Sequence, residues 1–268
     1  MKIDFLSDMI SLRKQLTAIL TVFLCFGLYY AFNEFYFAAI RKSFVPIVTT
    51  MFASIPAYLI VGIPIFIGFY GLKRFAKTGE TGLWKDPFPA VLFALIATLP
   101  MFVGYSFSFE FRDDLKIWRI VHGVLCAAFF EELYFRSFLF GMLYRNTKLG
   151  FIPAIVLGSL VFASGHLYQS QDPAILIRVF MVTFMGGLLF AWVFAEWKWN
   201  LWVPVFLHLF MNLSWMLFDV ANNAWGNNMA NLFRVLTIAF IILGTIIIKK
   251  RKKMAFEIRP KTLIWRKS

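Results

Sequence analysis

The sequence has little charge, few acidic residues and almost no cysteine or histidine. Asp, Glu, Lys and Arg make up only 15% of its 268 residues, whereas 60% are hydrophobic. Soluble domains are typically about a quarter charged and about 45–50% apolar. The two cysteines, Cys25 and Cys126, lie in separate apolar segments, a pattern that indicates neither a disulfide framework nor a thiolate metal site. We therefore do not expect a soluble domain.

The apolar residues come in long blocks. A membrane-spanning helix needs about 20 mostly apolar residues, and the sequence contains eight such windows, roughly at 15–38, 46–72, 88–109, 118–144, 151–169, 174–196, 200–219 and 231–248. The linkers between them are short, and neither an internal repeat nor a second domain is visible. The sequence predicts an all-α polytopic membrane protein with about eight transmembrane helices, in which residues 1–268 form a single transmembrane domain.

Positive charge is distributed unevenly between the predicted linkers. If the N-terminus is cytoplasmic, nineteen of the 27 Lys and Arg residues lie in inside segments and five in outside loops. Such a bias is typical of cytoplasmic segments, so we expect a multi-pass membrane protein with both termini cytoplasmic and a basic cytoplasmic tail at about 249–268. Because no basic patch interleaved with base-stacking aromatics occurs in a soluble region, we expect the lipid bilayer and no nucleic acid as a partner.

One predicted span, "FFEELYFRSFLF" at 129–140, carries three ionisable residues. Such groups are expensive within a bilayer and usually face a bundle interior or a cavity. Glu132 and Arg136 are four residues apart, which lets them pair on one face of a helix. Glu131 is five residues from Arg136 and points elsewhere. The spacing predicts a structural ion pair between Glu132 and Arg136, with Glu131 free to face another group.

Two of the three histidines lie within predicted membrane segments. His208 and Asn212 are four residues apart and share a helix face, as do Phe162 and His166. The third, His122, lies near the predicted outer surface, where an interfacial role is expected. Two intramembrane histidines, an asparagine and a surplus carboxylate together predict a polar functional site.

These residues form three motifs in a fixed order along the chain: Glu131-Glu132-x-x-x-Arg136, Phe162-x-x-x-His166 and His208-x-x-x-Asn212. The set resembles the CPBP family of CAAX-processing and bacteriocin-processing intramembrane proteases, also called the Abi family. The resemblance covers a motif-bearing core of about 118–219. It implies a helical bundle with an intramembrane, water-filled polar cavity, and hydrolysis of a peptide bond in a membrane-associated peptide or protein substrate of the CAAX type or the leader or bacteriocin type.

The residue types fit this chemistry. Amide hydrolysis needs an activated water, stabilisation of an oxyanion and a proton for the leaving amine. We expect Glu131 to act as the general base, His166 to orient the same water, and His208 with Asn212 to stabilise the oxyanion. Glu131, His166 and His208 also match a catalytic zinc set, although the compact H-E-x-x-H helix is missing. Two cofactor hypotheses stay open, no metal or one zinc ion.

Two other classes of function compete with a protease. A non-catalytic membrane partner or immunity protein would keep the fold but has no need of the full set of base and donors. A proton- or metal-coupled transporter would use buried Glu and His as a relay, yet the interrupted helices in paired repeats that mark many transporters are not visible. The intramembrane endopeptidase is the favoured interpretation.

Overall fold

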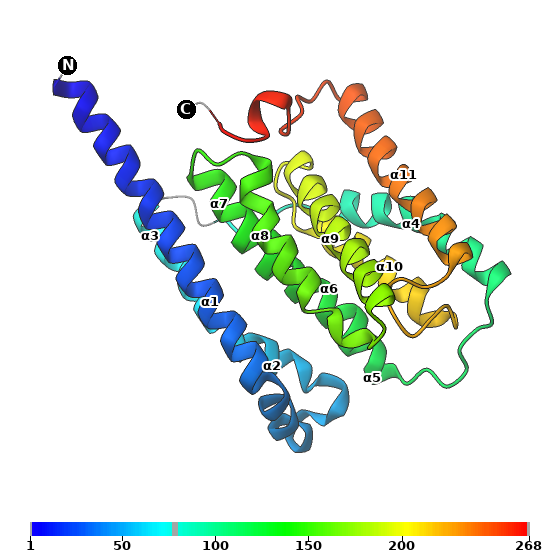
Figure 1. The fold of residues 1–268 in the computed structure, drawn as a ribbon. Helices are drawn as coiled ribbons and strands as arrows, with labels where there is room; N and C mark the ends of the chain where they lie inside the picture. Colours follow the sequence, from blue (N-terminus) through cyan, green and yellow to red (C-terminus); the bar gives the residue numbers. More distant parts are fainter. Residues whose placement is uncertain (1, 77–79, 267–268) are drawn as a thin grey trace.

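The computed structural model describes the backbone of residues 2–76 and 80–266, and the side chains of residues 12–74 and 80–266. In these ranges the regular structure is helical, and the only strand pairings are two isolated bridges. The helices pack side by side, with α1 and α3 along one edge and α4 and α11 along the other (Figure 1). The predicted all-α fold class is confirmed. The linker residues 77–79 and the tail residues 267–268 lie outside the described part.

The N-terminal helix is longer than the sequence windows predict. Helix α1 (Lys2–Phe52) runs through the loop expected between the first two windows and is broken by a kink at Thr49 (φ 68°, ψ 161°), where two helical stretches meet. The expected loop, 39–45, contains neither glycine nor proline to end the helix. The second window is formed by α2 (Ser54–Val61) and α3 (Ile63–Ala76), which meet at an angle of 49°.

Gly62 lies at the bend between α2 and α3. A side chain there would overlap the Tyr134 hydroxyl, which donates a 2.8 Å hydrogen bond to the carbonyl oxygen of Tyr58. Only a residue without Cβ permits this approach. The bend therefore fixes the N-terminal helices against the segment that carries the two glutamates.

The remaining predicted windows are also helical. Apart from the 118–144 window, they correspond to α4 (Phe88–Ser108), α8 (Phe151–Ser164), α9 (Pro173–Glu196), α10 (Trp202–Leu217) and α11 (Asn228–Arg251). In the described residues, five helices are long and apolar enough to cross a membrane, or six if the bent α2–α3 pair is one span. The windows 118–144 and 200–219 are not among them, because the first is divided into short stretches and α10 has only 16 residues. The protein is thus a multi-pass membrane protein with fewer qualifying spans than the eight windows.

The segment 117–146, here called the motif helix, alternates between two helical forms. Its successive stretches are α5 (Ile117–Ile120), π-helix η1 (Val121–Cys126), α6 (Ala127–Glu131), π-helix η2 (Glu132–Phe140) and α7 (Gly141–Asn146). The junction residues keep right-handed helical dihedrals, so the helix is continuous. All nine residues of η2 are buried. π-Helical stretches are rare and frequently occur at functional sites, which makes η2 the first place to look for one.

The C-terminal residues 252–266, here called the C-terminal strap, fold back over one end of the bundle (Figure 1). The backbone N–H groups of Gly150 and Ile152 donate 2.9 Å bonds to the carbonyl oxygens of Ile264 and Leu263. A side chain at Gly150 would overlap the strap backbone. The predicted tail therefore begins inside α11, and its described remainder packs against the bundle.

Linkers predicted to share one side of the membrane lie together. Arg145 donates to the carbonyl oxygen of Glu80 at 2.6 Å, and the Trp202 indole donates to that of Leu83 at 3.0 Å. The strap lies at this same end of the bundle, and so does the start of α1 (Figure 1). The grouping agrees with the alternating crossings predicted from the positive charges. The assignment of this end to the cytoplasm stays a prediction.

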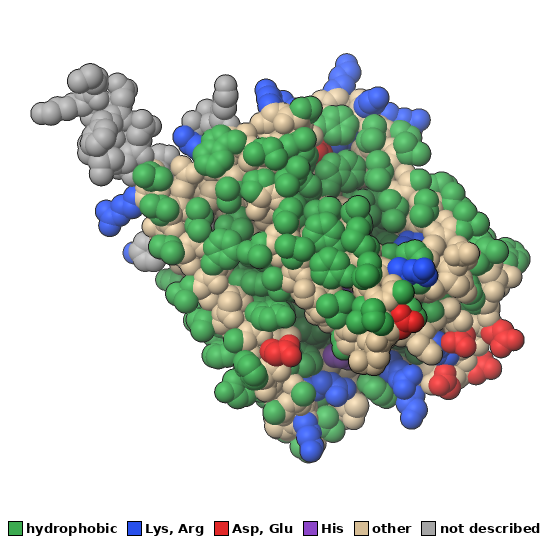
Figure 2. All heavy atoms as spheres, in the orientation of Figure 1, with side chains coloured by type: hydrophobic (Ala, Val, Ile, Leu, Met, Phe, Trp, Pro, Cys, Tyr) green, Lys and Arg blue, Asp and Glu red, His purple; other side chains and the backbone are tan. Residues whose placement is uncertain are grey.

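Large apolar side chains remain exposed over the outside of the bundle. Examples more than half exposed are Leu20, Ile67, Ile177, Val235 and Leu243. Figure 2 shows one face covered by hydrophobic side chains, with Lys and Arg at one end and mixed charges at the other. Such an apolar surface is suited to contact with lipid tails.

Candidate active site

The Glu132–Arg136 ion pair lies at the centre of the bundle. Glu132 Oε1 is 3.2 Å from Arg136 Nη1, and the two side chains are 0% and 1% exposed. The guanidinium also lies over the rings of Phe162, at 4.3 Å, and Phe190, at 5.6 Å. These rings come from α8 and α9, so the arginine joins the motif helix to two other helices.

His208 lies between the two glutamates. Its Nδ1 is 2.8 Å from Glu132 Oε1, and its Nε2 is 4.0 Å from Glu131 Oε2. A carboxylate that pairs with arginine can only accept hydrogen bonds, so Nδ1 carries a proton and donates it. This fixes the ring, with Nε2 directed toward Glu131. The Glu131 side chain is 23% exposed, which leaves it accessible from outside the buried pair.

The Glu132–His208 bond was missed by the sequence reasoning. The spacing within the motif helix assigned Glu132 to Arg136 alone, whereas the histidine lies 76 positions further along the chain. Helix geometry predicts partners on one helix and gives no signal for this contact. Glu132 is thus both the partner of a buried cation and the group that orients His208.

His166 and Asn212 lie beside this network without a contact to Glu131. The His166 Nδ1 is 2.7 Å from the carbonyl oxygen of Phe162, on whose ring the imidazole packs at 4.7 Å. Asn212 donates from Nδ2 to the carbonyl oxygen of Gly123 at 3.2 Å, which ties α10 to the motif helix. The structure therefore brings Glu131 and His208 together, and links His166 to the network through Phe162.

The donors predicted for zinc do not form a metal-binding group. Among the residues that the structure describes, no three His, Cys, Asp or Glu side chains lie close enough together to hold a metal ion. Glu131 and His208 are neighbours, but His166 does not join them as a third donor. The arrangement does not fit a zinc ion held by Glu131, His166 and His208.

Unused hydrogen-bonding capacity remains around the ion pair. Among the described residues, Glu132 Oε2 and Arg136 Nη2 are buried without a hydrogen-bond partner, and Arg136 Nη1 has only its 3.2 Å ion pair with Glu132 Oε1, which lacks hydrogen-bond geometry. A crevice lined by Arg136, Phe162 and Ser159 adjoins them but is too narrow for a water molecule. The space beside Arg136 is therefore closed, and the water-filled cavity that the resemblance implies stays a prediction.

The comparisons with known proteins agree on one class, membrane peptidases. Residues 113–214 match the family model described as Type II CAAX prenyl endopeptidase Rce1-like, and this range contains all three motifs. The chain is also 34% identical over 93 residues to the Bacillus subtilis (strain 168) protein named "Putative membrane peptidase YdiL", an alignment covering 35% of this chain and 34% of that protein. The chain thus matches about a third of that relative's length. No solved structure matches.

These matches confirm the family predicted from the motifs. The fold is that of a multi-pass membrane protein, with a Glu–His–Arg network buried inside the bundle. Its motif-bearing segment 113–214 is similar to the CPBP family, the CAAX-processing and bacteriocin-processing intramembrane proteases.

Proposed function

We propose that this protein is an intramembrane endopeptidase that uses a water activated by Glu131 to hydrolyse a peptide bond of a membrane-associated substrate. The substrate is of the CAAX type or of the leader or bacteriocin type. The supporting observation is the Glu131–His208 pair, in which the imidazole is held in one orientation by the buried Glu132. The family of residues 113–214 supports the same class of reaction.

The distance between Glu131 and His208 suits a shared water. Two atoms 4.0 Å apart can both reach one water molecule at ordinary hydrogen-bond distances of about 2.8 Å. Glu131 takes a proton from this water as the water oxygen attacks the peptide carbonyl carbon. The same proton then passes to the leaving amine as the C–N bond breaks. Because Glu131 is partly exposed, a substrate can reach its carboxylate, whereas the carboxylate of Glu132 is buried.

His166 and Asn212 complete the proposal on the basis of the motifs. The Asn212 amide has two N–H groups, and only one is used by Gly123. The second is available to donate to a developing oxyanion, and His208 joins it as a donor when the imidazole also carries a proton at Nε2. His166 is held at Nδ1 by the Phe162 carbonyl, which leaves Nε2 for the proposed contact with the water. No step is assigned to a metal ion, because the donors do not group.

Asn212→Ala is expected to lower kcat by about a hundred- to a thousandfold, the usual loss for one oxyanion donor. Steady-state kinetics on purified protein would measure the change. Ser214→Ala is the matched control, because Ser214 lies on the same helix and its hydroxyl also donates one hydrogen bond, to Met211. Equal losses in the two variants would show that the asparagine acts only through helix packing.

Activity is expected to survive exhaustive chelation. The reason is that Glu131, His166 and His208 do not form a three-donor group, whereas catalytic zinc takes three protein ligands. The metal content of the purified protein would be measured beside its activity. Three results together would contradict this mechanism: the purified protein contains about one equivalent of zinc, a chelator removes both the zinc and the activity, and added zinc restores the activity.

Two peptide probes in neutral-detergent micelles test the function itself. One is an S-farnesylated peptide ending in a CAAX sequence, and the other is an apolar leader-type peptide, each with a fluorophore and quencher on either side of the cleaved region. Cleavage of either probe supports the proposal and assigns the substrate class. Binding of both without cleavage would favour a non-catalytic partner protein, and proton-coupled uptake into liposomes would favour a transporter.

A further inference from the structure

A cavity of about 520 Å³ lies where the C-terminal ends of α9 and α11 meet the C-terminal strap. It is at the end of the bundle where the predicted cytoplasmic linkers gather, away from the Glu131–His208 pair. Its charged lining consists of four lysines and two glutamates, Lys198, Lys249, Lys252, Lys253, Glu196 and Glu257. The proposed proteolysis uses none of these residues.

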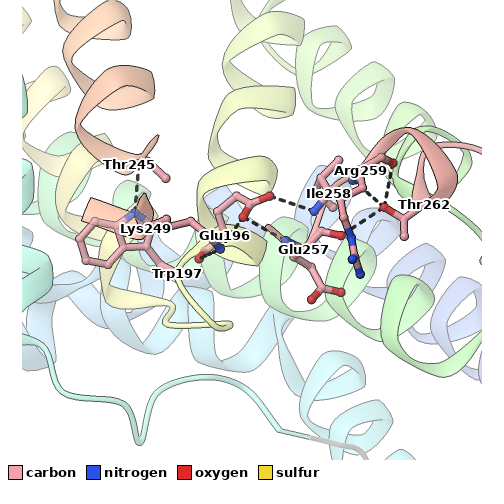
Figure 3. Close-up of polar contacts among 8 residues, drawn as sticks. All are labelled: Glu196, Trp197, Thr245, Lys249, Glu257, Ile258, Arg259 and Thr262. Atoms are coloured by element: carbon pink, nitrogen blue, oxygen red, sulfur yellow. Dashed lines mark hydrogen bonds and ion pairs between the residues drawn. The ribbon is translucent and has the colours of Figure 1, made fainter. Parts of the chain in front are cut away.

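One charge of each sign in this lining is already neutralised. Lys249 Nζ is 2.6 Å from Glu196 Oε2, and the two side chains are 4% and 0% exposed. The Glu196 carboxylate also accepts the backbone N–H groups of Glu257, at 3.1 Å, and Ile258, at 2.9 Å (Figure 3). Glu196 therefore holds the strap in place and has little capacity left for a ligand.

The other three lysines keep their charges available. Lys198, Lys252 and Lys253 are exposed, and among the described residues none of them forms an ion pair. Only Glu257 opposes them in the lining, so the cavity retains an excess of two positive charges. Such an excess in a confined space attracts anions.

Helix capping does not account for these lysines. Carbonyl oxygens at the C-terminal ends of α9 and α11 already accept backbone N–H groups, for example Phe194 from Trp199 at 3.0 Å and Lys249 from Met254 at 2.9 Å. The lysine side chains are therefore not needed as hydrogen-bond donors to these carbonyls.

Two of the lysines occupy backbone positions that suit glycine. Lys198 has φ 56° and Lys253 has φ 52°, the left-handed region that glycine adopts without strain. A helix often ends with glycine in this conformation. Both positions hold lysine instead of glycine, and both lysines line the same cavity.

We infer that this cavity binds a phosphate group. Each ammonium offers three donors and a compact charge to the phosphate oxygens. Trp197 and Trp199 lie at the same level, as expected where a protein meets lipid headgroups. Anionic phospholipid headgroups and free phosphate carry the same group, so the experiment has one arm for each source.

The test uses the full chain in neutral-detergent micelles, with short-chain phosphatidylglycerol in one arm and inorganic phosphate in the other. The variant carries Lys198→Gly and Lys253→Gly, which remove two ammonium groups at positions where glycine fits the backbone. The control carries Lys85→Gln and Lys261→Gln, which remove two charges outside the cavity lining. Binding is measured by calorimetry, and melting temperature without ligand reports on the fold.

The wild type and the control are expected to bind phosphatidylglycerol with affinities within about twofold of each other, and the glycine variant at least about tenfold more weakly, since a hydrogen bond to a charged group contributes that much. Competition by inorganic phosphate would identify free phosphate as a sufficient ligand, whereas lipid binding without competition would identify the headgroup. Failure of the wild type to bind either ligand, or equal weakening of both variants, would overturn the inference.

Discussion

Glu131→Gln is expected to lower the rate of peptide hydrolysis by about two to four orders of magnitude, the contribution of a general base, while the protein stays folded. Glutamine keeps the size and hydrogen-bonding capacity of the side chain but cannot take the proton of the attacking water. The side chain is partly exposed and lies 4.0 Å from His208, so little packing depends on its charge. The measurements are kcat on a cleaved probe and the melting temperature.

The control for this variant is Glu34→Gln, which makes the same chemical change at an exposed position of α1. It should retain wild-type kinetics and melting temperature. Wild-type turnover by Glu131→Gln would rule out Glu131 as the base, whatever the effect on folding.

Glu132→Gln is expected to destabilise the fold as well as the reaction. The substitution leaves the charge of Arg136, 1% exposed, without its partner, and breaking a buried pair costs about 3–5 kcal/mol. It also replaces the carboxylate that accepts from His208 Nδ1 by an amide oxygen, whose uncharged hydrogen bond holds the imidazole more weakly. We expect a low yield of folded protein, a lower melting temperature and low kcat in whatever protein is recovered.

A double variant separates the two effects of Glu132. When Glu132→Gln is combined with Arg136→Met, no uncompensated charge is buried, and replacing a whole pair is often neutral for stability. The melting temperature should recover toward that of the wild type, whereas activity should not, because His208 still lacks its carboxylate. Equal loss of fold in Glu131→Gln and Glu132→Gln would contradict the different roles of the two glutamates.

The helical segments were predictable because the signal for them is local. Each of the eight windows is read from about 20 consecutive residues, and each is helical in the structure. The continuation of α1 through residues 39–45 to its kink at Thr49 was missed, because apolar windows locate lipid-facing length and not helix ends. The π-helical stretches of the motif helix were also missed, since a hydrogen bond from i to i+5 has no signature in composition.

The site was predictable only in part, because its contacts are of two kinds. The Glu132–Arg136 pair follows from a spacing of four on one helix. The contacts of His208 with both glutamates depend on how α10 packs against the motif helix, which no spacing reveals. The resemblance named the residues of the candidate site, but the position of Asn212 beside Gly123 comes from tertiary packing alone.

The hydrogen bonds between the C-terminal strap and Gly150 and Ile152 have a consequence for biosynthesis. The chain emerges from the ribosome in order, and its segments begin to fold in that order. The turn after α7 is therefore made long before the backbone that will cover it, and it stays open until residue 264 has been synthesised. Ribosome-bound chains truncated before the strap should leave this turn open to protease, and closure should coincide with synthesis of the last described residues. The last tertiary contacts of this fold therefore form at the end of the bundle that the strap covers, after the helices have already entered the bilayer.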